Sequence, residues 1–254
     1  MCLLALFHRT VRGAPLLVAA NREEFFDRPF LPPRIEGQRR RYLAGIDVRA
    51  GGTWLGVNER GLLAAVTNRP KTTVPERPRS RGLLCRDLLE QATLADAAAH
   101  VRRELLSGDY AGANFVLATA EAGFLFEAGD ELCETPLPPG LHLVTNGPAN
   151  DPHDPRQQLV REMFAAAPPR DVASFLDTAQ RVCRQGADAA GRSVVLRRPE
   201  RGTVSSTLLA LPTDSAEAVY LFAGASPDVA PYDDYSQALR QLLSGQRPCD
   251  SEKP

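Results

Sequence analysis

The chain opens with Met1-Cys2-Leu3-Leu4-Ala5-Leu6-Phe7, in which an apolar run of the kind that forms a buried strand follows the first methionine. The turn-forming segment Arg12-Gly13-Ala14-Pro15 comes next, and Leu16 to Ala20 is a second short apolar run. Two such runs around a glycine-containing turn predict an antiparallel hairpin.

The register of this hairpin determines which side chains meet the N-terminal thiol. With the turn centred near Gly13, Cys2 is expected to face a residue near Glu24. The hairpin would then carry the polar cluster Asn21-Arg22-Glu23-Glu24 back beside Cys2.

Cys2 directly follows the initiator methionine, and methionine in front of so small a side chain is readily removed. Removal leaves a thiol with a pKa of about 8.5 next to an α-amino group of about 7.7–8.0, which is a nucleophile with its own general base. Cysteine is also among the most buried residue types and packs as a small hydrophobe, so a structural role is the alternative.

The remaining elements are read from spacing and turn residues. A second hairpin is expected at residues 52–57 and 62–68 around Asn58-Glu59-Arg60-Gly61. Further strands are expected at residues 114–119, 123–127, 141–146, 193–197, 205–211 and 218–222. Helical patterns predict helices at about residues 83–89, 93–106, 154–166, 171–183 and 234–243.

This order indicates an α+β protein. Strands, helices, strands and a last helix follow one another through hairpin links, which favours antiparallel sheets covered by helices over a parallel sheet. No break in composition divides the chain, so we expect one domain over residues 1–244 and a disordered tail over 245–254.

Composition limits the class of protein and its partners. Thirty basic and 31 acidic residues give a formal net charge of −1, so no overall field attracts nucleic acid. No apolar stretch approaches the ~20 residues of a membrane-spanning helix, and the N-terminal run lacks the basic region of a signal peptide. We expect no nucleic-acid partner and no integral membrane association; the oligomeric state stays open.

The five cysteines are widely spaced and form no CxxC pair, which is typical of a reducing compartment, so we expect a cytoplasmic protein. The short cluster Asp151-Pro152-His153-Asp154 is interpreted as a polar loop, and no metal site is expected.

Three predicted strands end in asparagine, at Ala19-Ala20-Asn21, Val66-Thr67-Asn68 and Val144-Thr145-Asn146. A single asparagine at such a position is usually a turn residue that tolerates a left-handed backbone. Three of them suggest amide donors for an oxyanion, which together with a thiol, an amine and an arginine would form an acyl-transfer site.

Several motifs together resemble one family. They are Met1-Cys2, Ala20-Asn21-Arg22-Glu23-Glu24, Gly51-Gly52-Thr53-Trp54-Leu55-Gly56-Val57-Asn58, Gly61-Leu62-Leu63-Ala64-Ala65-Val66-Thr67-Asn68-Arg69, Ser80-Arg81-Gly82 and Gly202-Thr203-Val204-Ser205-Ser206-Thr207. In this order, from residue 1 to about 225, the chain resembles the NRDE family, also called the transport and Golgi organisation protein 2 family.

The resemblance implies an αββα sandwich like that of the N-terminal-nucleophile hydrolases, with two antiparallel sheets between helical layers. It also implies amide-cutting relatives of the cholylglycine hydrolase and penicillin V acylase group, in which an N-terminal cysteine is the nucleophile. Carried over by motif, the catalytic residues would be Cys2, Arg22, Glu23, Asn68 and Asn146.

Residues around this set would form the rest of the pocket. Asn21 and Arg69 would contact the substrate, and Trp54 would belong to the core or to the pocket wall. The chain departs from the family pattern at two positions: Glu23 replaces an aspartate, and Val204 stands where arginine is frequent. Arg197 and Arg201 are candidates to replace that cation.

Two functions follow from the resemblance. The first is hydrolysis of a small acyl amide by Cys2, with Arg22 lowering the thiol pKa and Glu23 orienting Arg22 or the amine. The second is a non-catalytic carrier that uses the same pocket for an apolar ligand, haem or an acyl lipid. No cofactor is expected for the hydrolase, and the four histidines show no spacing typical of haem ligands.

Overall fold

The computed structural model describes residues 2–245, and its first hairpin is the predicted one. β1 (Leu3–Val11) and β2 (Ala14–Phe25) are antiparallel neighbours joined by Arg12-Gly13. Gly13 has a φ of +75°, a left-handed conformation that glycine adopts without a steric cost.

The register of this hairpin differs from the prediction by two residues. Leu3 pairs with Asn21 and Leu4 with Ala20, so continuing the ladder sets Cys2 opposite Arg22 and not Glu24. The turn is centred between Arg12 and Gly13, and β1 carries a bulge between His8 and Val11 that adds one residue to that strand. Arg22 is therefore the residue of the cluster that lies across from Cys2.

Two antiparallel sheets form the centre of the molecule. Their strand orders are β10-β1-β2-β11-β12-β13 and β3-β4-β5-β6-β7-β8-β9. The first sheet adds β10 (Gly140–Val144), β11 (Arg201–Leu211), β12 (Val219–Ala223) and β13 (Asp233–Asp234). The second contains β3 (Phe30–Glu36), β4 (Tyr42–Asp47), β5 (Leu55–Asn58), β6 (Leu63–Asn68), β7 (Ala113–Ala118), β8 (Gly123–Ala128) and β9 (Leu132–Pro136).

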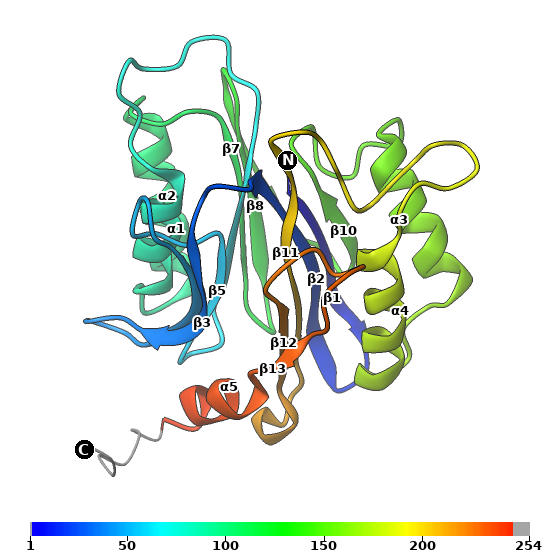
Figure 1. Cartoon of the computed structure of the whole chain (residues 1–254). Helices are drawn as coiled ribbons and strands as arrows, with labels where there is room; N and C mark the ends of the chain where they lie inside the picture. The colour runs from blue at the N-terminus through cyan, green and yellow to red at the C-terminus, as the bar shows by residue number, and fades with distance from the viewer. Residues whose placement is uncertain (1, 246–254) are drawn as a thin grey trace, which may run out of the picture.

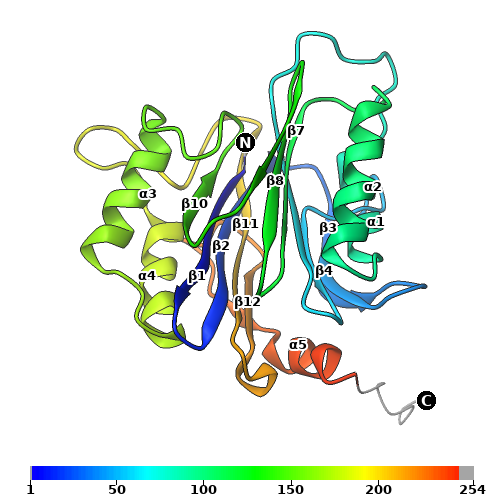
Figure 2. The same cartoon turned by 180° about the vertical axis from the view of Figure 1, so that it is seen from behind.

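Helices cover the outer face of each sheet, which confirms the predicted αββα sandwich. The helices are α1 (Arg81–Leu89), α2 (Leu94–Leu106), α3 (Pro155–Ala166), α4 (Val172–Arg184) and α5 (Ser236–Leu243). Figure 1 shows α1 and α2 on the side of β5 to β8, and α3 and α4 on the side of β1, β2 and β10. Seen from behind, the layers keep this order, and α5 lies at the end of the sandwich opposite the N-terminus (Figure 2).

Three apolar clusters fill the three interfaces between these layers. Leu4 and Leu6 of β1 belong to the cluster between the sheets, whereas Leu3 and Phe7 belong to the cluster beneath α3 and α4. The third cluster joins α1 and α2 to the second sheet. Because side chains alternate along a strand, Cys2 shares the face of Leu4 and is directed between the sheets.

One predicted strand is wrong. Residues 193–197 form an irregular segment with a single isolated bridge, from Arg197 to Gly202. The backbone N–H groups of Val194 and Val195 both donate to the carbonyl of Gln185, at 3.0 and 2.9 Å, and both valine side chains are buried. Burial of a loop, and not sheet pairing, accounts for this apolar β-branched run.

The strands β3, β4, β9 and β13 were not predicted, and β3 contains Pro32-Pro33. Proline lacks the N–H that an interior strand needs, but β3 is an edge strand with a bulge between Leu31 and Arg34. The arginine run at residues 39–41 lies in a loop, where Arg41 donates to Glu59 at 3.0 Å.

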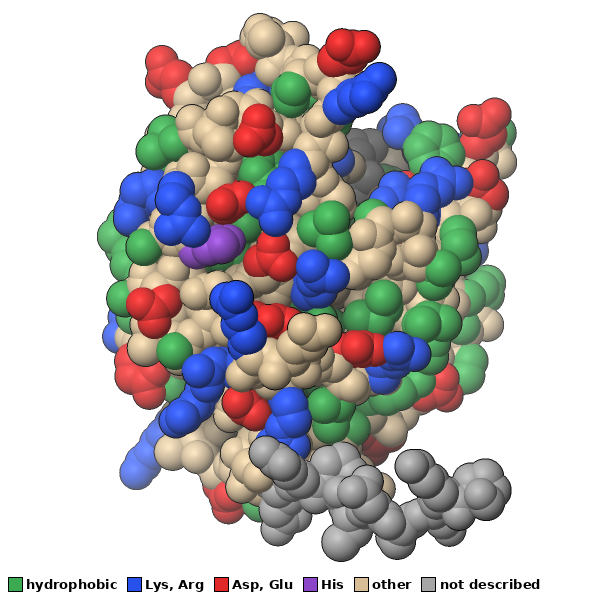
Figure 3. All heavy atoms as spheres, turned by 90° about the vertical axis from the view of Figure 1, so that its left-hand side faces the viewer, with side chains coloured by type: hydrophobic (Ala, Val, Ile, Leu, Met, Phe, Trp, Pro, Cys, Tyr) green, Lys and Arg blue, Asp and Glu red, His purple; other side chains and the backbone are tan. Residues whose placement is uncertain are grey.

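The face that includes α1 and α2 carries intermixed basic and acidic side chains (Figure 3). Arg102 and Glu134 form one such pair, with a nitrogen–oxygen distance of 2.7 Å. Within residues 2–245 no helix is long and apolar enough to cross a membrane. Apart from Gly245, the predicted disordered tail lies outside the described residues.

Candidate active site

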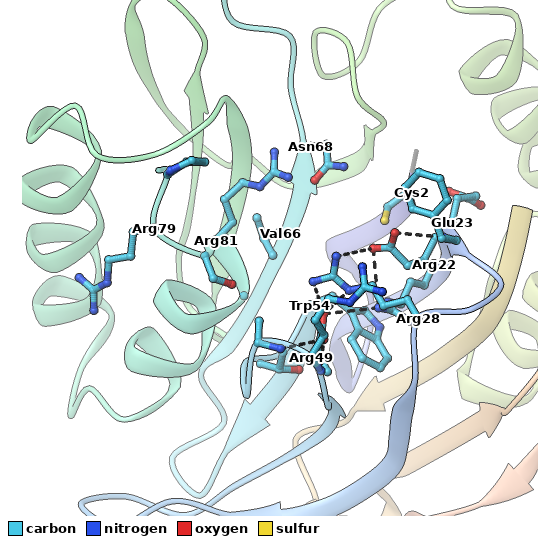
Figure 4. A pocket seen from close by; sticks show the side chains of 18 residues that line it. Cys2, Arg22, Glu23, Arg28, Arg49, Trp54, Val66, Asn68, Arg79 and Arg81 are labelled. Carbon is cyan, nitrogen blue, oxygen red and sulfur yellow. Dashed lines mark hydrogen bonds and ion pairs between the residues drawn. The ribbon is translucent and has the colours of Figure 1, made fainter. Parts of the chain in front are cut away.

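A cavity of about 400 Å³ lies beside Cys2, and eight of its eighteen lining residues are charged. It is bounded by the start of β1, the end of β2, the segments after β4 and before β5, and the first turn of α1 (Figure 4). The charged residues of the lining are Arg22, Arg28, Arg49, Arg79, Arg81, Glu23, Glu24 and Asp47. Such a volume is within the roughly 300–1,000 Å³ typical of small-molecule sites.

Cys2 is held at the cavity wall through its backbone. Its N–H donates to Asn146 Oδ1 at 3.1 Å, which joins the start of β1 to the segment after β10. The Cys2 side chain is half-buried and faces the same space as Asn68 (Figure 4). Removal of Met1 would turn this same nitrogen into an α-amine that remains next to Asn146.

The protein surroundings raise the pKa of the Cys2 thiol, contrary to the expectation from Arg22. Desolvation is the main cause, and the negative charge of Glu23 adds to it. Arg22 acts in the expected direction and lowers the pKa, but its contribution is smaller than that of desolvation. The thiol therefore needs a proton acceptor beside it in order to act as a nucleophile.

Arg22 is the buried cation of the site. Its side chain is only 4% exposed, and its Cζ lies 4.2 Å from the centroid of the Trp54 ring. Two carboxylates, Glu24 and Asp47, lie 3.8 and 3.7 Å from Nη2, whereas Nη1 has no hydrogen-bond partner among the described residues. Burial lowers the pKa of Arg22, and the negative charges of Cys2, Glu24 and Asp47 oppose this shift. Trp54 thus forms the cavity wall beneath Arg22, one of the two positions predicted for it.

Glu23 lines the cavity and also reaches the helical layer at β2. Its Oε1 accepts from Nη2 of Arg156, a residue of α3, at 2.5 Å and from the Thr203 hydroxyl at 3.3 Å. Burial raises the pKa of Glu23, while the charge and hydrogen bonds of Arg156 act against this shift. Through this bond to Arg156, the Glu23 carboxylate ties β2 to α3.

The two Val-Thr-Asn strand ends meet at the cavity. The Thr67 hydroxyl donates to the carbonyl oxygen of Thr145 at 2.7 Å, and this bond links the two sheets. Asn114 Nδ2 donates to the same carbonyl at 3.0 Å and to Gly147 O at 3.1 Å. These bonds hold Asn68 and Asn146, the residues that follow the two threonines, on the side of Cys2.

Two of the predicted substrate contacts lie outside the cavity lining. Asn21 is buried on the opposite face of β2, where its Nδ2 donates to Cys183 O at 3.0 Å near the end of α4. Arg69 pairs with Glu127 at 2.8 Å and donates to Asn114 Oδ1 at 3.1 Å. Both residues hydrogen-bond to structural elements next to the site and do not line the cavity.

The first turn of α1 reaches the cavity because two glycines allow close contact. The N–H of Thr53 donates to Gly82 O at 2.9 Å, and a methyl group at Gly52 would overlap the backbone of Gly82. Ser80 caps the helix by accepting from the N–H of Leu83. The motifs around residues 51–58 and 80–82 therefore form one wall of the cavity, with Arg81 at its edge.

The cations proposed to replace an arginine at position 204 do not line the cavity. Val204 lies at a bulge in β11, Arg197 pairs with Asp228, and the Cζ of Arg201 lies 5.9 Å from the Phe25 ring centroid. Arg81 and Asn114 were not predicted as site residues. The contacts that place both residues at the site are made to distant segments, which sequence patterns do not reveal. The one sequence signal was the motif Ser80-Arg81-Gly82 in front of a predicted helix, which includes Arg81.

The sequence comparison identifies the family. The family model described as transport and Golgi organisation 2 matches residues 1–185. This chain belongs to that family. The transport and Golgi organization protein 2 homolog of Bos taurus is 28% identical over 237 residues, covering 78% of this chain and 83% of the bovine protein. The Homo sapiens homolog is 33% identical over 178 residues, 64% of each chain.

Solved structures show which fold this member of the transport and Golgi organisation 2 family has. The conjugated bile acid hydrolase of Clostridium perfringens, solved as a mutant, matches with a TM-score of 0.55 at 12% identity, over 97% of this chain and 95% of its own. The penicillin V acylase of Agrobacterium tumefaciens gives 0.54 at 13%, over 93% and 87%. The Caenorhabditis elegans ortholog of N-acylethanolamine-hydrolyzing acid amidase gives 0.54 at 14%, over 84% and 95%. The predicted N-terminal-nucleophile hydrolase fold is confirmed.

Proposed function

We propose that this protein is an amidohydrolase in which Cys2, made N-terminal by removal of Met1, cleaves a small acyl amide. The observation that carries the proposal is the position of Cys2, whose side chain lines the cavity while its backbone nitrogen is bonded to Asn146. The proteins of similar fold are a conjugated bile acid hydrolase, a penicillin V acylase and an ortholog of an N-acylethanolamine-hydrolyzing acid amidase.

The reaction begins with transfer of the thiol proton to the Cys2 α-amine. This amine is a suitable base, since its ordinary pKa is about 7.7–8.0 and burial keeps the thiol protonated otherwise. The sulfur then attacks the carbonyl carbon of the substrate, and the oxygen gains negative charge. The Asn68 side chain, which lines the same cavity, supplies an amide N–H to that oxygen.

Collapse of this intermediate breaks the carbon–nitrogen bond, and the amine product leaves with the proton that the α-amine returns. A thioester then remains on Cys2. Water attacks its carbonyl carbon, the α-amine takes the proton from the water, and the carboxylic acid leaves as the sulfur is reprotonated. Arg22, across from Cys2, supports the charged states through its positive charge.

The acyl part of the substrate has an apolar surface available beside the cavity. A second hollow of about 580 Å³ is lined by Phe25, Phe26 and Pro199 together with the charged residues Asp27, Arg49 and Glu200, and it shares Phe25 and Arg49 with the first. The Phe26 side chain is 56% exposed, so an apolar chain lying on it would bury surface. The same hollow favours the second candidate, a non-catalytic carrier of an acyl lipid.

Haem gains less support as the cargo of such a carrier, because the described lining of the cavity includes no histidine. Cys2 is the one lining residue of the described cavity that could serve as a thiolate ligand. The carrier function tested below is therefore the binding of an acyl lipid.

The test uses the full chain and a panel of N-acyl amines of increasing acyl length. Intact mass reports whether the protein begins at Cys2. Cys2→Ala should reduce release of the fatty acid to the rate of a blank, and Cys133→Ala, which removes an exposed thiol, should leave it unchanged. Turnover that survives Cys2→Ala would overturn the mechanism. Binding of the acyl amide without turnover, equal in wild type and Cys2→Ala, would identify the carrier.

A further inference from the structure

The arginines that line the cavity differ in their ionic partners. Arg28 pairs with Asp47 at 2.6 Å, and Arg79 pairs with Asp87 at 3.0 Å and with Glu104. Arg49 lies 3.8 Å from Asp27, at the mouth. These side chains have carboxylates that balance their charge within the protein.

Arg81 has no such partner among residues 2–245. Its Nη1 donates to the carbonyl oxygen of Gly112 at 2.7 Å, and no carboxylate forms an ion pair with it. Burial lowers the pKa of Arg81, whereas the negative charges of Cys2 and Glu24 raise it. A guanidinium has five N–H donors, so most of the donors of this half-buried cation remain for a ligand.

The position of Arg81 connects it with the nucleophile. Its side chain extends from the first turn of α1 toward Asn68, which in turn faces Cys2 (Figure 4). On the other side of Cys2, Arg22 is 96% buried and lines the same cavity, and its Nη1 has no partner among the described residues. A buried donor without a partner is costly, and an anion in the cavity would satisfy it.

We propose that Arg81 determines specificity by binding a carboxylate of the substrate close to the scissile amide, which makes the substrate an N-acyl amino acid. This inference rests on the proposed function and names its substrate class. The planar fork of the guanidinium matches the two oxygens of a carboxylate. Glu24 and Asp47 in the same lining disfavour a doubly charged group such as a phosphate, so one negative charge is the better match.

Alkylation of Cys2 tests the carboxylate subsite without any need for turnover. Iodoacetate and iodoacetamide both alkylate the Cys2 sulfur by displacement of iodide, but only iodoacetate carries a carboxylate. The ratio of the two rates at Cys2, measured by peptide mass spectrometry, therefore reports attraction of the anion. Cys133, which is exposed, provides the same ratio away from the cavity as an internal standard.

Arg81→Met should lower the iodoacetate-to-iodoacetamide ratio at Cys2 about tenfold, because one charge close to the reacting atom is lost. Arg81→Lys should retain part of the preference.

Arg86→Met is the matched control: Arg86 also lies on α1 and also donates to a backbone carbonyl, that of Gly51 at 3.1 Å, but does not line the cavity. Its ratio should equal that of wild type. An unchanged ratio in Arg81→Met, with iodoacetamide reacting normally, would overturn the proposal.

Turnover provides a second arm that separates this proposal from the proposed function. An N-acylglycine should be cleaved faster than its neutral N-acylglycinamide, and Arg81→Met should remove the difference by slowing only the first. If neither is cleaved, or cleavage survives Cys2→Ala, the hydrolase assignment fails while the alkylation ratio still tests the subsite. If cleavage requires Cys2 but both substrates react equally in wild type and Arg81→Met, the carboxylate subsite alone is wrong.

Discussion

The Thr67 hydroxyl donates a 2.7 Å hydrogen bond to the carbonyl oxygen of Thr145, and this bond connects β6 of one sheet to the end of β10 of the other. Both residues are buried, with exposed fractions of 4% and 5%. Each is followed by an asparagine on the side of Cys2. The bond thus sets the distance between Asn68 and Asn146, which come from different sheets.

Thr67→Val preserves the shape of the side chain but removes this bond and the weaker one that the hydroxyl accepts from Asn114 Nδ2 at 3.2 Å. Because Asn114 still donates to Thr145 O, the free energy of unfolding should fall by only about 1 kcal/mol. The rate of Cys2-dependent turnover should fall more than this loss of stability explains, since Asn146 can shift. Thermal unfolding and kcat/KM are the measurements. Thr119→Val, at a loop where the hydroxyl donates to Ala122 O at 3.3 Å, is the control and should change neither by much.

The pH dependence of Cys2 labelling should respond oppositely to its two charged neighbours. Glu23 raises the pKa of the thiol and Arg22 lowers it. Only the thiolate reacts, so Glu23→Gln should move the midpoint of the iodoacetamide rate profile to lower pH, and Arg22→Met should move it to higher pH. Glu162→Gln breaks a surface pair with Arg192 and should leave the midpoint in place. Shifts of the same sign in both variants would contradict this electrostatic account.

Gly52→Ala should displace the first turn of α1. The added methyl group overlaps backbone atoms of Gly82 and Leu83, which cannot rotate away as a flexible side chain could. We expect a loss of roughly 1–3 kcal/mol in unfolding free energy. The alkylation preference of Cys2 for iodoacetate should also fall, because Arg81 moves with the helix. Gly186→Ala, where a methyl group would contact nothing within 4 Å, is the matched substitution and should be close to neutral.

Asn21→Ala should affect stability and leave substrate binding intact. Its amide satisfies the carbonyl of Cys183 near the C-terminus of α4, where helical carbonyls lack intrahelical donors. The expected loss is about 1–2 kcal/mol in unfolding free energy. Trp54→Leu, which removes the ring beneath Arg22, should instead raise KM. A rise in KM for Asn21→Ala as large as that for Trp54→Leu would restore Asn21 as a substrate contact.

Local signals accounted for most of the elements. Turn glycines such as Gly13 and Gly61 have the positive φ that their hairpins require, and Thr93 caps α2 by accepting from the N–H of Asp96 at 3.1 Å. The register of the first hairpin was not predictable to the residue, because the bulge after His8 leaves no mark in the hydrophobic pattern. The segment at 193–197 has the composition of a strand but is a buried loop.

Site residues that belong to a sequence motif could be predicted, whereas residues placed at the site by tertiary contacts could not. Cys2, Arg22, Asn68 and Trp54 line the cavity. Asn114 looked like an ordinary strand residue, because its three acceptors lie in two distant segments. Arg81 could not be distinguished from other arginines by sequence, since its role depends on the absence of an ionic partner within residues 2–245.

The alternation of β2 divides the work of its polar cluster between two sides of the sheet. Arg22 and Glu24 face the cavity, whereas Asn21 bonds to α4 and the carboxylate of Glu23 bonds to α3. Arg22 and Glu24 therefore act within the cavity and Asn21 anchors an outer helix. Glu23 does both, because it lines the cavity, raises the thiol pKa and bonds to α3. A library that diversifies only positions 22 and 24 could reshape selectivity while the scaffold stays as it is.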